Sequence, residues 1–180
     1  KKIKTDPEDE ETKRVEIQLW KRIQKKCIEG RRTGVGITAE GDMLAALGLR
    51  YGTTKATDFA VEVHKTYAIE VFRASNKLAK ERGAFKIWDP ALEQNHPFLN
   101  RIKAEDPRLY KDLMKFGRRN IALLTIAPTG TVSLMAQVSS GIENIFLVAY
   151  RRRKKINPND PDTRTDFVDD IGDHWEEYNV

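Results

Sequence analysis

The chain has 180 residues, about the size of one domain or one and a half, and 39% of them are hydrophobic. Its formal net charge of +5 permits polyanionic partners without requiring them. Its single cysteine, Cys27, excludes an internal disulfide, and its 3 histidines lack the spacing of a zinc site, so we expect no metal site. No apolar run has membrane-spanning length and no signal region is visible, so we expect a cytoplasmic protein without a membrane partner. The opening at Lys1 in a charged segment suggests a fragment or one part of a split protein.

Residues 7–29 have helical spacing, because Val15, Leu19, Ile23 and Cys27 fall on one stripe. Gly30 is the expected C-cap of this helix. We interpret Cys27 as a small buried hydrophobic residue rather than a reactive thiol.

Residues 31–38 form a short extended segment that contains Gly34 and Gly36. With Gly41, their spacing is G-x-G-x-x-x-x-G, which differs from the dinucleotide fingerprint G-x-G-x-x-G, and no apolar strand precedes them. Close packing of the backbone against a neighbouring element is the better explanation for these glycines. A helix over residues 39–47 should follow, with Thr38 as a possible N-cap.

A long helix is predicted over residues 54–82, ended by Gly83. Its apolar face would comprise Ala60, Val63, Tyr67, Val71, Ala74 and Leu78. Breaks are expected at residues 85–90 and 95–98. Asp106 followed by Pro107 predicts an N-cap and the first position of a helix that Gly117 ends.

Residues 121–127 are apolar and uncharged, which predicts a buried strand covered on both faces. Pro128 would end that strand, and a loop with a glycine and three hydroxyls leads into a helix that continues to Val138. Free amides and hydroxyls at such a helix start can hold a phosphate. The alternative is an ordinary strand-to-helix turn capped by Thr129 or Thr131.

Residues 139–143 predict a second turn, and residues 145–150 a second apolar strand. Five consecutive cations then occupy residues 151–155, followed by an acidic stretch over residues 160–177. We interpret these as a solvated turn and a solvated helix. Nucleic-acid binding by the cations is the alternative, although no aromatic ladder accompanies them.

Three of these segments together resemble ribonucleotide reductases, most closely the adenosylcobalamin-dependent (class II) large subunit. They are Arg31-Arg-Thr-Gly-Val-Gly-Ile-Thr38 with Gly41-Asp42 behind it, Leu124-Thr-Ile-Ala-Pro-Thr-Gly-Thr-Val-Ser133, and Ser139-Ser-Gly-Ile-Glu143. The resemblance implies an α/β fold, namely the C-terminal part of a ten-stranded α/β barrel, helix-rich with a few buried strands. Residues 1–156 would belong to that barrel, and residues 157–180 would be an acidic C-terminal segment of the same domain.

The resemblance also implies that the loop holds the phosphates of a ribonucleotide substrate through Pro128, Thr129, Gly130, Thr131, Val132 and Ser133. The complete enzyme would make deoxyribonucleotides by radical chemistry, with adenosylcobalamin as cofactor and a thioredoxin-like reductant. The family's thiyl-forming cysteine and redox cysteine pair have no counterpart here, and Asn144 replaces the usual proline after Ile-Glu. We therefore expect no catalytic residue in this chain, and a complementary N-terminal reductase segment or self-association as its partner.

The alternative function is a non-catalytic interaction or polyanion-binding module that uses residues 151–155.

Overall fold

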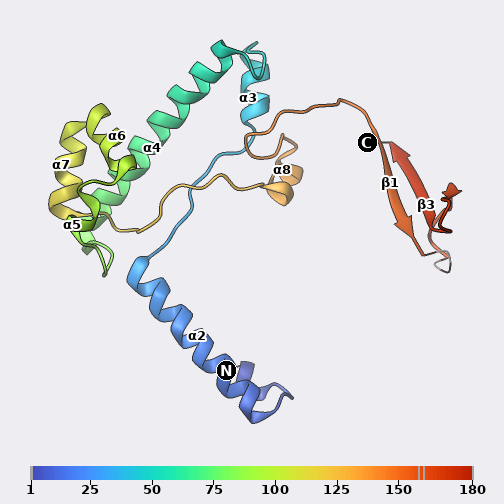
Figure 1. Ribbon diagram of the computed structural model, residues 1–180, viewed down its shortest axis with the longest axis horizontal. Coiled ribbons are helices and arrows are strands. Elements are labelled where there is room, and N and C mark those ends of the chain that lie inside the picture. Colours follow the sequence, from blue (N-terminus) through green and yellow to red (C-terminus); the bar gives the residue numbers. More distant parts are fainter. Residues whose placement is uncertain (1, 158, 160, 180) are drawn as a thin grey trace. The chain divides into compact units, whose positions relative to one another are not determined.

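The computed structural model of the chain describes residues 2–157, 159 and 161–179 (Figure 1). Its contacts divide into two units, Lys1–Ile142 and Glu143–Val180. The predicted division after residue 156, between two parts of one domain, stays a prediction.

The first unit is helical. The helices predicted over residues 7–29, 39–47, 54–82 and 107–116 are confirmed, with small differences at their ends, and the helix predicted to continue to Val138 is confirmed but ends at Ala136. The observed helices are α1 (Lys2–Thr5), α2 (Glu10–Gly30), α3 (Glu40–Ala46), α4 (Thr54–Arg82), α5 (Pro90–Glu93), α6 (Pro97–Glu105), α7 (Pro107–Phe116) and α8 (Gly130–Ala136).

Helix α2 forms as predicted, but its apolar stripe is not covered by other described residues. Asp9 caps the helix by accepting a hydrogen bond from the Thr12 amide, and Arg31, rather than Gly30, is the left-handed C-cap. Leu19 is 47% exposed, and Cys27 is exposed as well. The prediction of a buried Cys27 is therefore wrong, because helical periodicity identifies an apolar face without showing what covers it.

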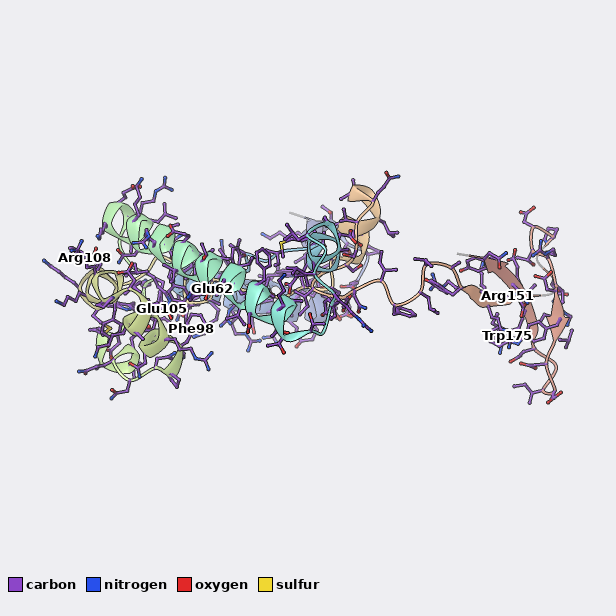
Figure 2. The ribbon with its side chains drawn as sticks, turned by 90° about the horizontal axis from the view of Figure 1, so that it is seen from above. Glu62, Phe98, Glu105, Arg108, Arg151 and Trp175 are labelled. Atoms are coloured by element: carbon purple, nitrogen blue, oxygen red, sulfur yellow. The ribbon has the colours of Figure 1, made fainter. Side chains whose placement is uncertain are left out.

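The core of the first unit lies between α4 and the α6–α7 pair. Its buried members are Phe72, Leu99, Ile102, Leu109, Leu113 and Leu123. The rings of Phe72 and Phe98 stack with centroids 5.3 Å apart. Figure 2 shows Phe98, Glu105 and Arg108 on the α6–α7 hairpin, beside the helix that carries Glu62.

The predicted apolar face of α4 is wrong in its C-terminal half. Ala74 and Leu78 are exposed, whereas the buried positions include Ser75 and Asn76. The Asn76 side-chain amide donates to the carbonyls of Asp112 and Gly117, so a polar residue faces α7. A pattern of apolar residues alone cannot find such a contact.

Local signals place α7 correctly and also account for α6, which was not predicted. The Asp106 carboxylate accepts from the Leu109 amide at 2.9 Å and from Arg73 Nη2 at 2.9 Å. The Leu109 amide, and to a lesser extent Arg73, lower the pKa of Asp106. His96 caps α6 in a similar way, by accepting from the Phe98 amide.

Residues 121–127 are extended, but the prediction of a strand buried on both faces is wrong. A single parallel bridge joins Val35 to Leu124, supported by hydrogen bonds from the Val35 amide to the Leu123 carbonyl and from the Thr125 amide to the Val35 carbonyl. Leu123 is buried, whereas Ile126 is 60% exposed. Among the described residues the segment is paired on one side, and its middle residues Leu123 and Leu124 pack against the helical core, whereas Thr125 and Ile126 are exposed.

The two glycines of the facing segment permit this pairing. A Cβ atom at Gly34 would lie 2.9 Å from Thr125 Cγ2, and one at Gly36 would lie 2.5 Å from the Thr125 carbonyl oxygen. The prediction that these glycines serve close backbone packing is confirmed.

The second unit contains a three-stranded antiparallel sheet in the order β1-β3-β2. The strands are β1 (Arg151–Ile156), β2 (Phe167–Val168) and β3 (His174–Asn179). Three expectations are therefore wrong, since the cations form a strand rather than a turn, the acidic stretch contributes strands rather than a helix, and residues 145–150 form no strand. Phe146 and Val148 are 78% and 96% exposed.

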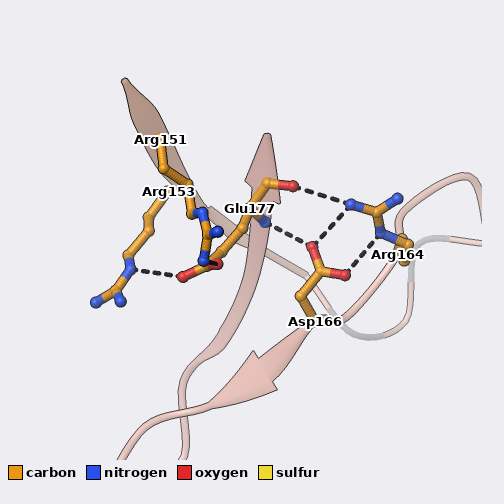
Figure 3. A network of polar contacts seen from close by, with 5 residues as sticks. All are labelled: Arg151, Arg153, Arg164, Asp166 and Glu177. Carbon is orange, nitrogen blue, oxygen red and sulfur yellow. Dashed lines mark hydrogen bonds and ion pairs between the residues drawn. The ribbon is translucent and has the colours of Figure 1, made fainter. Parts of the chain in front are cut away.

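Complementary charge explains why these residues pair as strands. Arg153 lies opposite Glu177 in the β1–β3 register, and the Glu177 carboxylate accepts from Arg151 at 3.0 Å and from Arg153 at 2.9 Å. Asp166 accepts from the Glu177 amide and pairs with Arg164, as Figure 3 shows. Opposite charges directly across a sheet stabilise it, and the separate cationic and acidic runs hid this register.

The helix-rich prediction is confirmed. Among residues 2–157, 159 and 161–179 the one sheet has three strands and is not a closed barrel. None of the described helices is long and apolar enough to cross a membrane. The same residues contain no cluster of three His, Cys, Asp or Glu side chains that could hold a metal ion.

Replacing Gly36 with alanine tests the close approach. The new Cβ would meet the Thr125 carbonyl, so we expect Gly36→Ala to lower the free energy of unfolding by about 1–3 kcal/mol in urea denaturation. Gly130→Ala is the matched control, because nothing lies within 4 Å of its Cβ position and we expect a change within about 0.5 kcal/mol. Equal stability of the two variants would contradict the pairing.

Candidate functional site

The three segments that the sequence singled out converge in the first unit. The residues around Thr38, the loop before α8 and the turn at residues 139–141 are joined by hydrogen bonds across about one hundred residues of sequence. Figure 1 shows α8 close to the chain that leads into α3. The grouping of these segments by resemblance therefore corresponds to a spatial cluster.

Thr129 is the centre of this cluster. Its Oγ1 lies 2.8 Å from Thr38 Oγ1 and accepts from the Gly141 amide at 2.8 Å. Its backbone is left-handed, with φ of 52°, which is uncommon for a β-branched residue. The Thr129 hydroxyl therefore shapes the loop from inside. The predicted use of Thr38 and Thr129 as side-chain helix caps is wrong, since α3 begins after Ala39 and the side chain of Thr129 makes no capping hydrogen bond to α8.

Ser133 is also turned inward. It is 4% exposed, and its Oγ donates to the Gly130 carbonyl at 2.8 Å and lies 2.8 Å from Ser140 Oγ. Together with Thr129, it uses its hydroxyl to hold the loop and the 139–141 turn together.

Three consecutive residues at the start of α8 are exposed to solvent. Gly130, Thr131 and Val132 are exposed, as is Pro128 before them. The first amides of a helix have no intrahelical acceptor. In α8 these are the amides of Gly130, Thr131 and Val132, and they have no acceptor among the described residues, whereas the Ser133 amide already donates to the Thr129 carbonyl. This arrangement can donate several hydrogen bonds to an anion.

Gly130 has a different role from the one expected of a loop glycine. Its φ is not in the left-handed region, and its Cβ position is open space. The backbone therefore does not require glycine there. Its missing side chain instead leaves the first amides of α8 accessible.

The contacts between α3 and the turn at residues 139–141 were not predicted. The Asp42 carboxylate accepts from the Ser139 amide at 2.8 Å, and Ser139 Oγ accepts from the Asp42 amide at 3.3 Å. Ala39 supports the same turn through its amide, which donates to the Ser139 carbonyl, and has a φ of 65°. The motif Gly41-Asp42 was visible in the sequence, but nothing local indicated a partner almost a hundred residues away.

The basic run offers little free charge for a polyanion. Arg151 and Arg153 pair with Glu177, and Lys155 pairs with Asp173. The alternative function as a polyanion-binding module would rest on Arg152 and Lys154.

Thr129→Val tests the inward hydroxyl. Valine keeps the side-chain shape but removes one acceptor of the Gly141 amide, so we expect a loss of about 1 kcal/mol in the free energy of unfolding, measured in urea. Thr129→Ser keeps the hydroxyl and should stay within about 0.5 kcal/mol of the native chain. A valine variant as stable as the serine variant would show that the hydroxyl does not hold the loop.

Known proteins resemble this chain over most of its length. Residues 13–172 match the family model of the ribonucleotide reductase barrel domain. A vitamin B12-dependent ribonucleoside-diphosphate reductase from Mycobacterium tuberculosis is 34% identical over 122 residues, covering 68% of this chain and 15% of the relative. Its counterpart from Thermoplasma acidophilum is 33% identical over 130 residues, covering 72% of this chain and 15% of the relative.

A ribonucleoside-diphosphate reductase subunit alpha from Mycoplasma pneumoniae is 26% identical over 151 residues, covering 68% of this chain and 21% of the relative. The chain thus spans about 15% of the length of the B12-dependent relatives. The resemblance seen in the motifs is confirmed, and the chain belongs to the ribonucleotide reductase barrel-domain family.

Proposed function

We propose that this chain supplies the substrate-phosphate-binding loop of a ribonucleoside-diphosphate reductase. The observation that carries the proposal is the convergence of residues 38–42, 128–133 and 139–141. In this cluster the amides of Gly130, Thr131 and Val132 have no acceptor among the described residues. Family membership supports it, because the motif resemblance assigns phosphate binding to this loop.

The six loop residues then divide into two roles. Gly130, Thr131 and Val132 donate their amides to the phosphate oxygens, and the partial positive charge at the helix start adds to the attraction. Thr129 and Ser133 hold the loop in shape from inside, and Pro128 ends the extended segment that leads into it.

The chemistry of the complete enzyme would be reduction of a ribonucleotide to a deoxyribonucleotide, started by a cysteine thiyl radical and completed by electrons from a cysteine pair. Those cysteines are not in this chain, whose only cysteine is Cys27 on α2. We therefore expect the isolated chain to bind substrate phosphates without reducing the ribose.

Adenosylcobalamin would supply the radical in the complete enzyme, as the names of the B12-dependent relatives suggest. We assign no cobalt ligand among the described residues, whose three imidazoles lie on separate elements. His64 pairs with Glu40, His96 accepts from Phe98, and His174 contacts Thr165. We derive no step through the cofactor from this chain.

The parallel pairing of residues 33–35 with residues 122–125 suits two neighbouring strands of a ten-stranded α/β barrel. The rest of that barrel would come from a complementary reductase segment or from self-association. Uncovered apolar residues support such a partner, namely Val15, Leu19, Trp20 and Ile23 on α2. A thioredoxin-like reductant and a cytoplasmic location complete the proposal.

Amide NMR with a nucleoside diphosphate tests the proposed site. Addition of the nucleotide should shift the Gly130, Thr131 and Val132 amides. Gly130→Leu should weaken binding at least about tenfold by covering these amides, since a phosphate contact at a helix start is short-ranged.

Val132→Ala is the matched control, because it changes a side chain and keeps the amide, so its affinity should stay within about twofold. Shifts that avoid residues 130–132, or equal binding by Gly130→Leu and the native chain, would contradict the site.

A further inference from the structure

Glu40 is an unusual residue in this structure. Its exposed fraction is 7%. Among the residues that the structure describes, it is the one charged residue that is buried. Its Oε2 lies 2.7 Å from Nε2 of His64 on α4, and His64 is the one hydrogen-bond or ion-pair partner of that carboxylate among the described residues. A buried carboxylate is costly unless it is paired, so the imidazole contact is needed to keep it there.

The backbone of Glu40 faces the turn of the candidate site. The Glu40 amide donates to the Gly141 carbonyl at 3.2 Å, and the preceding Ala39 amide donates to the Ser139 carbonyl at 3.1 Å. One residue therefore connects two elements. Its side chain is held by α4, and its main chain holds the 139–141 turn.

The connection continues from this turn to the loop before α8. The Gly141 amide donates to Thr129 Oγ1 at 2.8 Å and to Thr38 Oγ1 at 3.1 Å. Thr129 directly precedes Gly130, the first residue of α8. Displacement of Glu40 would thus reach the loop through a continuous series of hydrogen bonds.

Helix α3 needs such support because its own start is weak. It has only 7 residues, its N-cap Ala39 is left-handed and has no capping side chain, and its Asp42 amide depends on Ser139 Oγ from the distant turn. Short helices without caps are marginal on their own. The contact between Glu40 and His64 adds a restraint from α4 to those that Ser139 supplies.

We propose that Glu40, held by His64, is a positioning residue for the phosphate-binding loop, acting through the 139–141 turn. This inference rests on the proposed function of that loop. Glu40 does not touch the phosphate in this scheme. It holds the 139–141 turn in place beside α3, and Gly141 of this turn in turn holds the Thr129 hydroxyl.

The test compares Glu40→Ala, Glu40→Gln and Glu62→Ala in the full 180-residue chain. Glu62 is the matched control, because it also is a glutamate near a basic residue of α4 but its side chain is 64% exposed. Two quantities are measured, namely hydrogen exchange of the Gly141 amide and the affinity for inorganic pyrophosphate. Exchange of the core amides of α7 reports general destabilisation.

We expect Glu40→Ala to speed Gly141 exchange and to weaken pyrophosphate binding, each by about tenfold, with the α7 amides unchanged. Glu40→Gln should stay within about threefold, because its amide group can still hydrogen-bond the imidazole. Glu62→Ala should behave as the native chain. His64→Ala should reproduce the effect of Glu40→Ala, and the two changes combined should not multiply.

Native-like Gly141 exchange and affinity in Glu40→Ala would overturn the inference, and so would an equal rise in exchange at the α7 amides. Failure of the native chain to bind pyrophosphate would refute the proposed function instead. In that case the exchange measurements still decide whether Glu40 positions the turn.

Discussion

The close approach of Gly36 to the Thr125 carbonyl is the constraint on which the candidate site depends. It allows two extended segments about ninety residues apart to pair in parallel, with hydrogen bonds around Val35 and Leu124. One segment then leads into α3 and the other into α8, so both helices begin near each other. Leu123 anchors the pair on the helical core beside Phe72. A side chain at Gly36 would separate the strands and the site with them.

The site at the end of this pair is held together largely by hydroxyls of buried or half-buried residues. Thr38, Thr129, Ser133 and Ser140 bond one another or the backbone, and the Asp42 carboxylate bonds Ser139. These contacts satisfy polar groups inside the loop cluster and leave the first amides of α8 unsatisfied. A preformed set of donors reduces the ordering that a bound phosphate would otherwise require.

Features with a local cause could be predicted from the sequence. Asp106 and Pro107 fix the start of α7, Gly83 ends α4, and the two glycines at positions 34 and 36 signal a close approach. Features that depend on distant partners could not. The pairing of Arg153 with Glu177 turns two charged runs into strands, and the bond between Asn76 and Gly117 turns a polar face toward the core. The resemblance pointed to the loop that we propose as a phosphate site, but the inward direction of Thr129 depends on Gly141.

The central claim is that the first amides of α8 hold a phosphate beside the 139–141 turn. The most direct measurement is X-ray diffraction from crystals of the chain grown with pyrophosphate. We predict phosphate density within hydrogen-bonding distance of the Gly130, Thr131 and Val132 amides, with the Thr129 hydroxyl still bonded to Gly141. Pyrophosphate bound instead at Arg152 and Lys154 of β1, with the α8 amides free, would contradict the account.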